Sequence, residues 1–388
     1  MRVLQLHNQY RRPGGEDAVV DAEASLLRQA GHDVLTHTAT NPMDWQQAAL
    51  KFAVAPWNRH AAERVVEVAQ RFQPDIAHVH NTWFTLTPAS VAALHPLGVP
   101  VVMTLHNYRL ICANSYLFRD GGPCEKCVGS HPWHGVRHRC YNHSAMASAQ
   151  AAWTIASSHR RGTWQHDVDL FFALSRFARD RFVAGGLPAN RIDIKPHFVA
   201  DPGPRRQPPS ASRQLVYVGR LAPEKGVDVL IDAIDRLDGL ELAVIGDGDE
   251  RTKLKRRAGP RVRFLGHLPP AQVRHAMLQA RALAFPSLSY ETFGLVMVEA
   301  MAAGLPVLAS NLGGSPDLVR PEVGELVAPG DVDAWVTALR GLNDTRVDEQ
   351  GANARQQWEK RFSPAAALPA LEEGYRWALS QHQSGSTP

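Results

Sequence analysis

Short apolar runs alternate with amphipathic stretches through the first half of the chain. The spacing of the apolar residues predicts strands and helices in turn. The expected strands cover 3–7, 33–38, 75–80 and 99–106, and the expected helices cover 17–29, 61–72 and 88–94. Because strands that alternate with helices form a parallel sheet wrapped by helices, we expect an α/β domain here.

Parallel sheets of this kind bind ligands beyond the carboxyl ends of their strands. His7, His80 and His106 stand at three such ends, and Gly14 and Gly15 lie in the loop after the first strand. A single histidine at such a place is most often structural. Three at one rim also fit a ligand site lined by imidazoles, so the sequence leaves both interpretations open.

The first domain is expected to span 1–197. A helix over 145–165 and strands over 170–175 and 192–195 continue the alternation. A proline-rich stretch with little apolar pattern follows, and this composition is typical of an interdomain linker. We place the linker at 198–213.

The alternation of strands and helices resumes after this linker. The expected strands cover 215–218, 240–246, 263–266, 282–286 and 305–309, and the expected helices cover 270–279 and 328–342. This pattern predicts a second α/β domain over 214–362. A helix over 363–381 and a disordered tail over 382–388 should complete the chain.

Two acidic residues mark the segment 289–314 of the second domain. Glu291 lies in a turn, and Glu299 falls within a strongly apolar helical run that should end at Gly304. A carboxylate in an apolar run is expected to be partly buried and to need partners. The alternative is that both acids are simply solvated, and for two acids alone that alternative is favoured.

The start of the same helix has features of a binding site. The residues expected in its first turn are Phe293, Gly294 and Leu295. The first N–H groups of a helix lack partners inside the helix and suit anionic or hydroxyl-rich ligands. A glycine there lets a ligand approach the backbone closely.

A second candidate site follows the strand at 215–218. Gly219 ends the strand, and Arg220 and Lys225 lie in the turn before a helix. Two cations beside a helix N-terminus form a clamp for a diphosphate. In isolation, an arginine and a lysine in a loop are more often solvated.

These segments together resemble a known family. The resemblance rests on ETFGLVMVEAMAAGLPVLAS at 291–310, VGRLAPEKGVDVLIDAI at 218–234 and FFALSRFARDRFVAGGLPANRIDIKP at 171–196. Two glutamates separated by seven residues are similar to the signature of retaining nucleotide-sugar glycosyltransferases of the GT-B fold. The family is glycosyltransferase family 4, also called group 1 glycosyltransferases.

The resemblance implies a fold and a reaction. The fold would be GT-B: two Rossmann-like domains whose parallel sheets face each other across a crevice, with a C-terminal helix crossing back to the first domain. The reaction would be retaining, metal-independent transfer of a hexosyl group from a UDP- or GDP-sugar to a hydroxyl. The acceptor would be a glycan or a lipid-linked molecule, in bacterial surface polysaccharide or glycolipid biosynthesis.

The resemblance also implies roles for individual residues. Gly14 and Gly15 would approach the donor diphosphate, and His106 would contact the transferred sugar. Many relatives place an acid after that histidine, whereas this chain has Asn107. The remaining donor-side residues would be Gly219, Arg220 and Lys225 at the diphosphate, Phe264 near the base, Glu299 at the ribose, and Glu291 with Phe293, Gly294 and Leu295 at the sugar.

Other functions are compatible with the same fold, since fold does not fix function. A sugar-nucleotide epimerase, a phosphorylase and a non-catalytic sugar-nucleotide-binding protein are the alternatives. The intact Glu291, Glu299, Arg220 and Lys225 favour an enzyme over a binding module.

Four cysteines lie close together in the sequence, within a segment at 108–143 that reads as an insertion into the first domain. They are Cys112, Cys124, Cys127 and Cys140, the only cysteines of the chain. A central C-x-x-C pair with two flanking thiols can form a tetrahedral structural zinc site. Free thiols and disulfides are the alternatives, and four thiolates would leave no open position for catalysis by zinc.

Net charge and hydropathy limit the classes of partner that the protein is expected to bind. The 388 residues carry a formal net charge of +4, too little for a dedicated nucleic-acid-binding protein. The sequence shows neither a signal peptide nor a transmembrane segment, so we expect a cytoplasmic protein. The basic runs at 253–263 and 59–71 leave peripheral contact with the inner membrane face open, although solvated helix faces are the favoured explanation of both.

Overall fold

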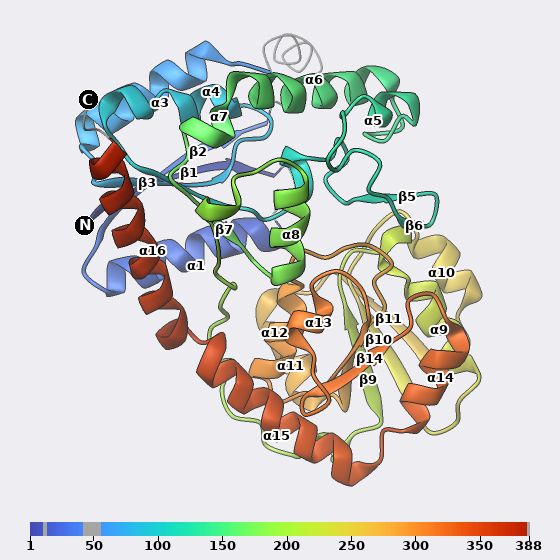
Figure 1. The fold of residues 1–388 in the computed structure, drawn as a ribbon. Coiled ribbons are helices and arrows are strands. Elements are labelled where there is room, and N and C mark those ends of the chain that lie inside the picture. Colours follow the sequence, from blue (N-terminus) through green and yellow to red (C-terminus); the bar gives the residue numbers. More distant parts are fainter. Residues whose placement is uncertain (11–13, 42–55, 386–388) are drawn as a thin grey trace. The chain divides into compact units, whose positions relative to one another are not determined.

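The computed structural model describes residues 1–10, 14–41 and 56–385. The chain divides into two compact units. Unit 1 comprises Met1–Leu117, Glu125–Pro196 and Leu368–Pro388, and unit 2 comprises Phe118–Cys124 and His197–Ala367. Each unit contains a parallel sheet of six strands, so the prediction of two Rossmann-like α/β domains is confirmed (Figure 1).

The sheet of unit 1 has the order β2-β1-β3-β4-β7-β8, with every neighbouring pair parallel. Its strands are β1 (Arg2–Gln9), β2 (Asp33–Thr40), β3 (Ile76–Asn81), β4 (Val101–Thr104), β7 (Leu170–Ala173) and β8 (Ile192–Ile194). All residues of β3, β4 and β7 are buried. Continuous burial explains the apolar sequences of β4 and β7, whereas β3 also buries His78, His80 and Asn81.

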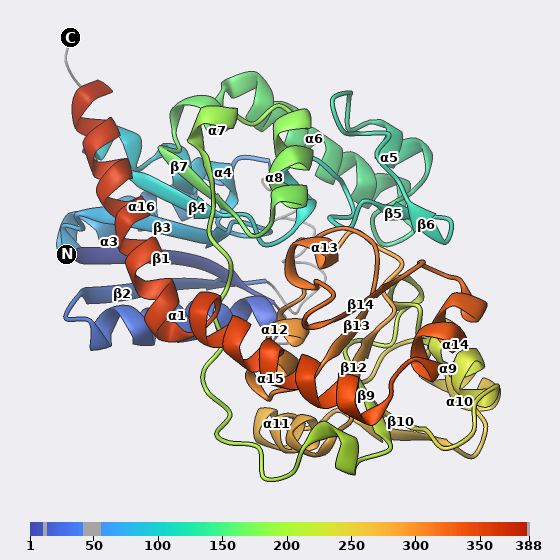
Figure 2. The same ribbon diagram turned by 60° about the horizontal axis from the view of Figure 1, so that its bottom comes forward.

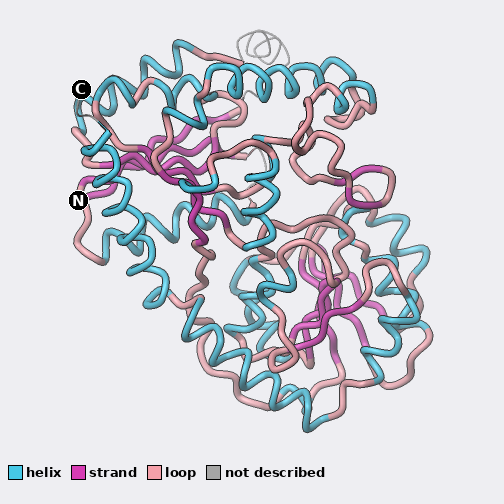
Figure 3. Tube along the Cα trace, viewed as in Figure 1, coloured by secondary structure: helices cyan, strands magenta, loops and turns pink. Residues whose placement is uncertain are grey.

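Helices lie on both faces of this sheet, as the tube in Figure 3 shows. Before the last helix of the chain, unit 1 contains α1 (Gly15–Gln29), α3 (Arg59–Phe72), α4 (Thr87–Ala92), α5 (His134–Arg137), α6 (Ala145–Arg161), α7 (Thr163–His166) and α8 (Arg176–Ala184). The side chains of Asn58, Ser144 and Ser175 accept hydrogen bonds from the first turns of α3, α6 and α8. These N-caps fix where each helix begins.

The sheet of unit 2 has the order β11-β10-β9-β12-β13-β14, again all parallel. Its strands are β9 (Gln214–Val218), β10 (Glu241–Ile245), β11 (Val262–Gly266), β12 (Ala282–Phe285), β13 (Val307–Ser310) and β14 (Gly324–Val327). The chain therefore runs outward from β9 to one edge and then returns to build the other half from β12. This is the doubly wound order of nucleotide-binding domains.

The helices of unit 2 cover its sheet on both faces (Figure 1). They are α9 (Val227–Asp235), α10 (Arg251–Arg257), α11 (Pro270–Gln279), α12 (Leu295–Ala302), α13 (Ser315–Leu318), α14 (Val332–Arg340) and α15 (Asp344–Arg361). A core of leucine, valine and isoleucine side chains joins β9, β10, α9 and α14, with Trp335 fully buried within it.

The last helix, α16 (Pro364–Gly385), begins in unit 2 and continues in unit 1 from Leu368 onward. Its Leu371, Tyr375 and Ala378 are buried in the core of unit 1, together with residues of β1 and α1. Figure 2 shows the length of this helix. The sequence predicted the helix, but it predicted disorder from residue 382, whereas α16 extends to Gly385; residues 386–388 lie outside the described part.

The expected linker at 198–213 is an ordered part of unit 2. Ser210 donates hydrogen bonds from its backbone N–H and its hydroxyl to the Asp348 carboxylate at 2.9 and 2.7 Å. The Arg205 guanidinium donates to the carbonyls of Met277 and Ala280. The structure places the boundary between the units at Pro196 and His197. The segment after this boundary has few apolar residues to bury, and hydrogen bonds attach it to unit 2 instead.

The segment at 108–143 has little regular structure. It contains a short 3-10 helix, the antiparallel pair β5 (Phe118–Arg119) and β6 (Gly122–Pro123), and α5. Its residues Phe118–Cys124 belong to unit 2, and the remainder belongs to unit 1. Across the described residues, every helix is too short or too polar to span a bilayer.

Candidate functional site

The strand order of unit 2 reverses between β9 and β12, and ligands of doubly wound sheets bind beyond the strands at that point. The loop after β9 contains Gly219, Arg220 and Lys225, and the loop after β12 contains Glu291. Four residues predicted from separate stretches of sequence are therefore placed at one edge of one sheet. We call this edge the donor-side rim.

Charged side chains at the donor-side rim are paired. The Lys225 ammonium lies 2.5 Å from Glu291 Oε1, and the Ser287 hydroxyl donates to the same oxygen at 2.9 Å. The Arg220 guanidinium pairs with Glu224, while half of the Arg220 side chain stays exposed. Each predicted cation thus has an acidic partner.

The glycine turn after β13 supports Glu291. The Gly314 N–H donates to the Glu291 carbonyl at 2.8 Å. Gly313 has φ +61°, and a Cβ at this position would lie 2.7 Å from the Glu291 backbone nitrogen. Only glycine combines this left-handed conformation with so close an approach, so the turn fixes the position of the Glu291 loop.

Helix α12 begins two residues later than the sequence predicted. Gly294 is the N-cap, with φ +89°, and Leu295 is the first helical residue. Phe293 lies before the helix, is buried, and packs edge-on against the rings of His197 and Phe362. The placement of Phe293 in the first turn is therefore wrong: the left-handed glycine separates it from the helix, and its ring is part of the core.

Glu299 lies in the middle of α12, among residues that are mostly buried. Burial raises the pKa of this carboxyl to about 7, and the positive charge of Arg274 only partly opposes the effect. The sequence predicted partial burial, and the half-buried position confirms it. Glu299 consequently changes its protonation state near neutral pH.

The other predicted donor-side residues of unit 2 have structural contacts. A side chain at position 219 would be crowded, because a Cβ there would lie 2.8 Å from the Tyr217 hydroxyl. Phe264 lies within β11, half-buried against the core, with the Lys255 ammonium 6.0 Å from its ring centre. Both are located at the same sheet, and neither contact tests a role in binding a base or a phosphate.

In unit 1 the strand order reverses at β1 and β3, and the three predicted histidines lie near this point. His80 Nδ1 is 3.1 Å from His106 Nε2. The His7 ring lies edge-on to the His80 ring, with centroids 6.4 Å apart, and its Nε2 is 2.9 Å from Asp17 Oδ1. The structure therefore joins two of the three histidines directly and places the third beside them.

Burial decides the protonation of the paired histidines. It lowers the pKa of His80 and of His106 well below the usual range of an imidazole, and neighbouring histidines add to the effect. Both rings are therefore neutral at neutral pH. Gly14 and Gly15 are exposed at the start of α1, where the Gly14 N–H donates to Asp17 Oδ2 at 2.8 Å.

A carboxyl that sequence reasoning missed lies beside Asn107. The Tyr10 hydroxyl donates to Glu16 Oε2 at 2.9 Å, and the Asn107 amide donates to the same oxygen at 3.3 Å. Burial raises the pKa of Glu16 to about 8. The acid that relatives carry after the histidine is absent here, and Glu16 brings a carboxyl to the neighbouring side chain. The only sequence signal was its place beside the glycine loop.

A second missed group lies deeper in unit 1. Glu23 of α1 and Lys195 after β8 form an ion pair with 2.7 Å between Nζ and Oε2, and both side chains are almost fully buried. A signal did exist: Glu23 interrupts the apolar face that Val19, Val20 and Leu27 present along α1. An acid on the buried stripe of a helix predicts a buried partner.

The four cysteines are free thiols in the structure; Cys112 is buried and the others are half-buried. Among the described residues, the group whose potential ligand atoms converge within 4.8 Å is Glu23, His78 and His80, and it contains no cysteine. The structural zinc site thus stays a prediction.

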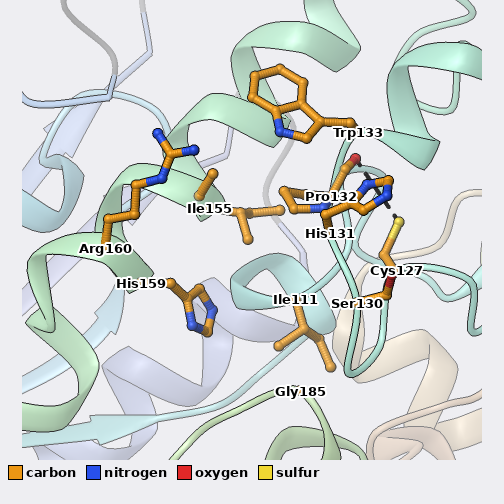
Figure 4. A pocket seen from close by; sticks show the side chains of 11 residues that line it. Ile111, Cys127, Ser130, His131, Pro132, Trp133, Ile155, His159, Arg160 and Gly185 are labelled. Carbon is orange, nitrogen blue, oxygen red and sulfur yellow. Dashed lines mark hydrogen bonds between the residues drawn. The ribbon is translucent and has the colours of Figure 1, made fainter.

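The cysteine segment does help to form a hollow in unit 1. Figure 4 shows this hollow of about 260 Å³, with apolar walls from Ile111, Pro132, Trp133 and Ile155 and polar groups from His159 and Arg160.

Comparison with known proteins agrees with this geometry. Residues 13–201 match the model of glycosyltransferase family 4, and residues 204–361 match the model of glycosyl transferases group 1. The chain is 28% identical to the sulfoquinovosyl transferase SQD2 of Arabidopsis thaliana over 86% of its own length and 62% of that protein. It is 36% identical to the glycogen synthase of Mycobacterium tuberculosis over 74% of its length and 64% of that enzyme. The chain thus spans under two thirds of these relatives.

A further relative is matched over more of its length. The phosphatidyl-myo-inositol mannosyltransferase of Mycolicibacterium smegmatis is 28% identical over 85% of this chain and 81% of that enzyme.

Solved structures show the same fold. The sucrose-phosphate synthase of Thermosynechococcus elongatus superposes with a TM-score of 0.70 at 19% identity, covering 98% of this chain and 100% of that one. The Anabaena protein HepE in complex with UDP gives a TM-score of 0.66 at 21% identity, covering 96% and 99%. The two family models and the shared GT-B fold lead to one conclusion: this chain belongs to the group 1 and family 4 glycosyltransferases.

Proposed function

We propose that the protein transfers a hexosyl group from a nucleoside diphosphate sugar to a hydroxyl, with retention of the anomeric configuration and without a metal ion. The observation that supports this most is the donor-side rim, where Lys225 pairs with Glu291 and Arg220 lies in the same loop as Lys225. Membership of the glycosyltransferase family agrees with the proposal.

The donor-side rim suits the charge that develops during transfer. As the glycosidic bond lengthens, negative charge grows on the departing diphosphate. Glu291 and Glu224 hold Lys225 and Arg220 at the rim. When the donor binds, its diphosphate takes the place of these carboxylates as the partner of the two cations. One such preorganised donor contributes about 3 to 4 kcal/mol to transition-state stabilisation. These cations take the role that a metal ion has in other glycosyltransferases.

The hydroxyl groups of the transferred sugar and of the ribose have candidate hydrogen-bond partners, which include two carboxylates. Glu291 and the backbone at Gly294 and Leu295 hold hydroxyls of the transferred sugar, and the ionised Glu299 accepts hydrogen bonds from the ribose. His106 contacts the sugar as a neutral imidazole. A covalent intermediate would need a carboxylate on the far face of the sugar. We assign no residue to that position, so attack from the front face is the proposed route.

We further propose a UDP- or GDP-sugar as donor and a glycan or lipid-linked molecule as acceptor. HepE was solved with UDP, and a relative is named for a phosphatidylinositol acceptor. The hollow of Figure 4, with apolar walls and Arg160 at its side, is a candidate place for part of such an acceptor. A role in bacterial surface polysaccharide or glycolipid synthesis, at the cytoplasmic side of the membrane, would follow.

A donor panel tests the proposal. The purified protein is titrated with UDP-, GDP-, ADP- and dTDP-sugars, and both thermal shift and slow hydrolysis of the donor are measured. Lys225→Ala and Glu299→Ala should remove the response to the preferred donor. Lys253→Ala and Glu349→Ala are matched controls on exposed positions of the same unit and should retain it. Folded protein that responds to no nucleotide sugar would overturn the proposal.

A further inference from the structure

A buried carboxylate lies behind the paired histidines of unit 1. Glu23 Oε2 receives the Lys195 ammonium at 2.7 Å, and Glu23 Oε1 lies 2.8 Å from His78 Nδ1 and 3.6 Å from His80 Nε2. The side chains of all four residues are 3% exposed or less. Burial opposes ionisation, but the Lys195 ammonium outweighs it and holds the pKa of Glu23 well below its usual range. Glu23 is therefore a carboxylate.

Two polar atoms of this cluster lack a well-aligned partner within the described part of the chain: Glu23 Oε1 and His80 Nε2. They face each other at 3.6 Å. His78 Nδ1 lies 2.8 Å from the same carboxylate oxygen and 2.7 Å from the Tyr375 hydroxyl, and its Nε2 meets the Thr104 hydroxyl at 2.8 Å. A lone pair of His80 directed at a carboxylate would be repelled, whereas a proton there is attracted. The His80 proton therefore sits on Nε2.

The tautomer of His80 determines that of His106. With its proton on Nε2, neutral His80 has only a lone pair at Nδ1, and that atom is 3.1 Å from His106 Nε2. One of two nitrogens in a hydrogen bond must donate, so His106 donates from Nε2 and keeps its lone pair at Nδ1. We propose that Glu23 is a positioning residue that acts through His80 to fix His106 as its Nε2–H tautomer, so that His106 offers the substrate a hydrogen-bond acceptor.

This inference deepens the proposed function, because it rests on His106 contacting the transferred sugar. A lone pair at Nδ1 accepts a hydrogen bond from a sugar hydroxyl and cannot donate one. The buried Glu23 thereby selects donors that present a hydroxyl, as opposed to an acceptor-only group, to His106. This preference for a hydroxyl arises from neutral His80 and His106 and from the buried ion pair of Glu23 and Lys195 behind them. No net charge is placed beside the sugar.

A metal ion is the competing interpretation of Glu23, His78 and His80, whose ligand-type atoms lie within 4.8 Å of one another. The Lys195 ammonium already neutralises the carboxylate at 2.7 Å, and a divalent cation beside it would be strongly repelled. The same carboxylate also accounts for the orientation of both histidines without an ion. Tautomer control therefore fits the charges of the cluster better than metal binding.

The tautomers can be observed directly in the unmodified protein. Long-range ¹H–¹⁵N correlation spectra of histidine-labelled protein distinguish Nδ1–H, Nε2–H and imidazolium forms, and a His106→Gln sample assigns the His106 signals. We expect His106 to be neutral with its proton on Nε2 between about pH 6 and 8. A proton on Nδ1, an imidazolium form, or a stoichiometric metal in the purified protein would overturn the inference. This readout does not depend on turnover.

Turnover by variants separates positioning from support of the fold. Glu23→Gln is combined with Lys195→Met, because a lone buried ammonium would destabilise unit 1. We expect kcat to fall about 10- to 100-fold, in the range seen when a partner of an active-site histidine is lost, with KM for the donor within about twofold. The matched control is Glu372→Gln, whose carboxylate pairs with His32 at 2.9 Å elsewhere in unit 1, and it should leave kcat unchanged.

The two experiments distinguish the two proposals. If the wild-type protein turns over a donor but the spectra show His106 protonated on Nδ1, the inference about the tautomer is wrong and the proposed transferase function is retained. If the spectra show the Nε2–H form but no nucleotide sugar is bound or cleaved, the transferase falls and the tautomer assignment stands. Should the double variant fail to fold, the wild-type spectra still decide the inference.

Discussion

Residue scale: the side chains that matter most are acids whose ionisation is opposed by burial. Glu299 and Glu16 have pKa values raised to about 7 and about 8, while Glu23 stays ionised beside Lys195. The sequence identified Glu299 because it interrupts an apolar run. It identified neither the pKa shifts nor Glu16, because both arise from tertiary packing that local sequence does not encode.

The raised pKa of Glu299 predicts pH-dependent donor affinity. The carboxyl is protonated below about pH 7 and ionised above it, and the ionised form accepts stronger, charge-assisted hydrogen bonds from hydroxyls. Donor affinity should therefore rise as pH increases from 6 to 8, by up to about tenfold per unit below the pKa. Calorimetric titration with an intact nucleotide sugar measures this.

Glu299→Gln provides the control for this prediction. The amide does not titrate, so the variant should bind the donor more weakly at pH 8 and lose the rise with pH. A variant that keeps the wild-type pH dependence would assign the titration to another group.

Element scale: the periodic pattern of apolar residues predicted eleven of the twelve strands that form the two six-stranded sheets. It missed β14 and α15. The strand has only four residues, and α15 is polar with Gly351 at its centre, where a Cβ would lie 2.6 Å from the Gly304 carbonyl. Glycine has a low helix propensity, so its presence weakens the sequence prediction of α15. The close approach of the Gly304 carbonyl explains why position 351 is a glycine.

The glycine turn after β13 provides a prediction at this scale. In Gly313→Ala the new Cβ would meet the backbone of Tyr290 and Glu291 at 2.7 to 3.0 Å, so the loop that carries Glu291 must move. We expect donor affinity and kcat to fall together, by at least about tenfold, since small displacements in a site are costly. Activity measurements and thermal melting check this.

Gly330→Ala is the matched control. Gly330 also has a positive φ, +75°, but its nearest heavy atom to an added Cβ is 3.7 Å away. Both variants pay about 1 to 2 kcal/mol for the left-handed conformation, whereas only Gly313→Ala should impair donor binding. Equal losses of affinity in the two variants would argue against a role for the turn.

The cysteine segment gives a second prediction about an element. If Cys112, Cys124, Cys127 and Cys140 hold structural zinc, protein purified under reducing conditions should contain about one zinc per chain. Replacing Cys124 and Cys127 by serine should remove the metal and lower the melting temperature. Metal analysis of wild-type protein measures the first quantity. Metal-free protein with an unchanged melting temperature would leave the four residues as ordinary thiols.

Whole-molecule scale: the division into two units followed from the repetition of the α/β pattern, but the exact boundary did not. The proline-rich segment read as a linker because it lacks apolar periodicity, and hydrogen bonds to Asp348 and to carbonyls anchor it in unit 2. The last helix contributes to the core of unit 1 although its first residues belong to unit 2. The family resemblance implied that this helix returns to the first domain, but the side chains that it buries there are known only from the fold.

The contribution of α16 to unit 1 is testable by truncating one side chain. Leu371 is 1% exposed in the core that contains Val3 and Phe172, so Leu371→Ala should lower the free energy of unfolding by about 2 to 5 kcal/mol. The exposed Glu373 on the same helix offers a control, Glu373→Ala, with little expected effect. Chemical denaturation measures both. A negligible effect of Leu371→Ala would show that α16 is not needed for the stability of unit 1.

The central claim is that this chain transfers a sugar with retention and without a metal ion. The most direct test follows the anomeric proton signals by NMR during turnover of the preferred donor with a hydroxyl acceptor, in the presence of a chelator. The account predicts a product with the anomeric configuration of the donor, formed at the same rate with and without the chelator. An inverted product, or turnover that stops when metal is removed, would contradict it.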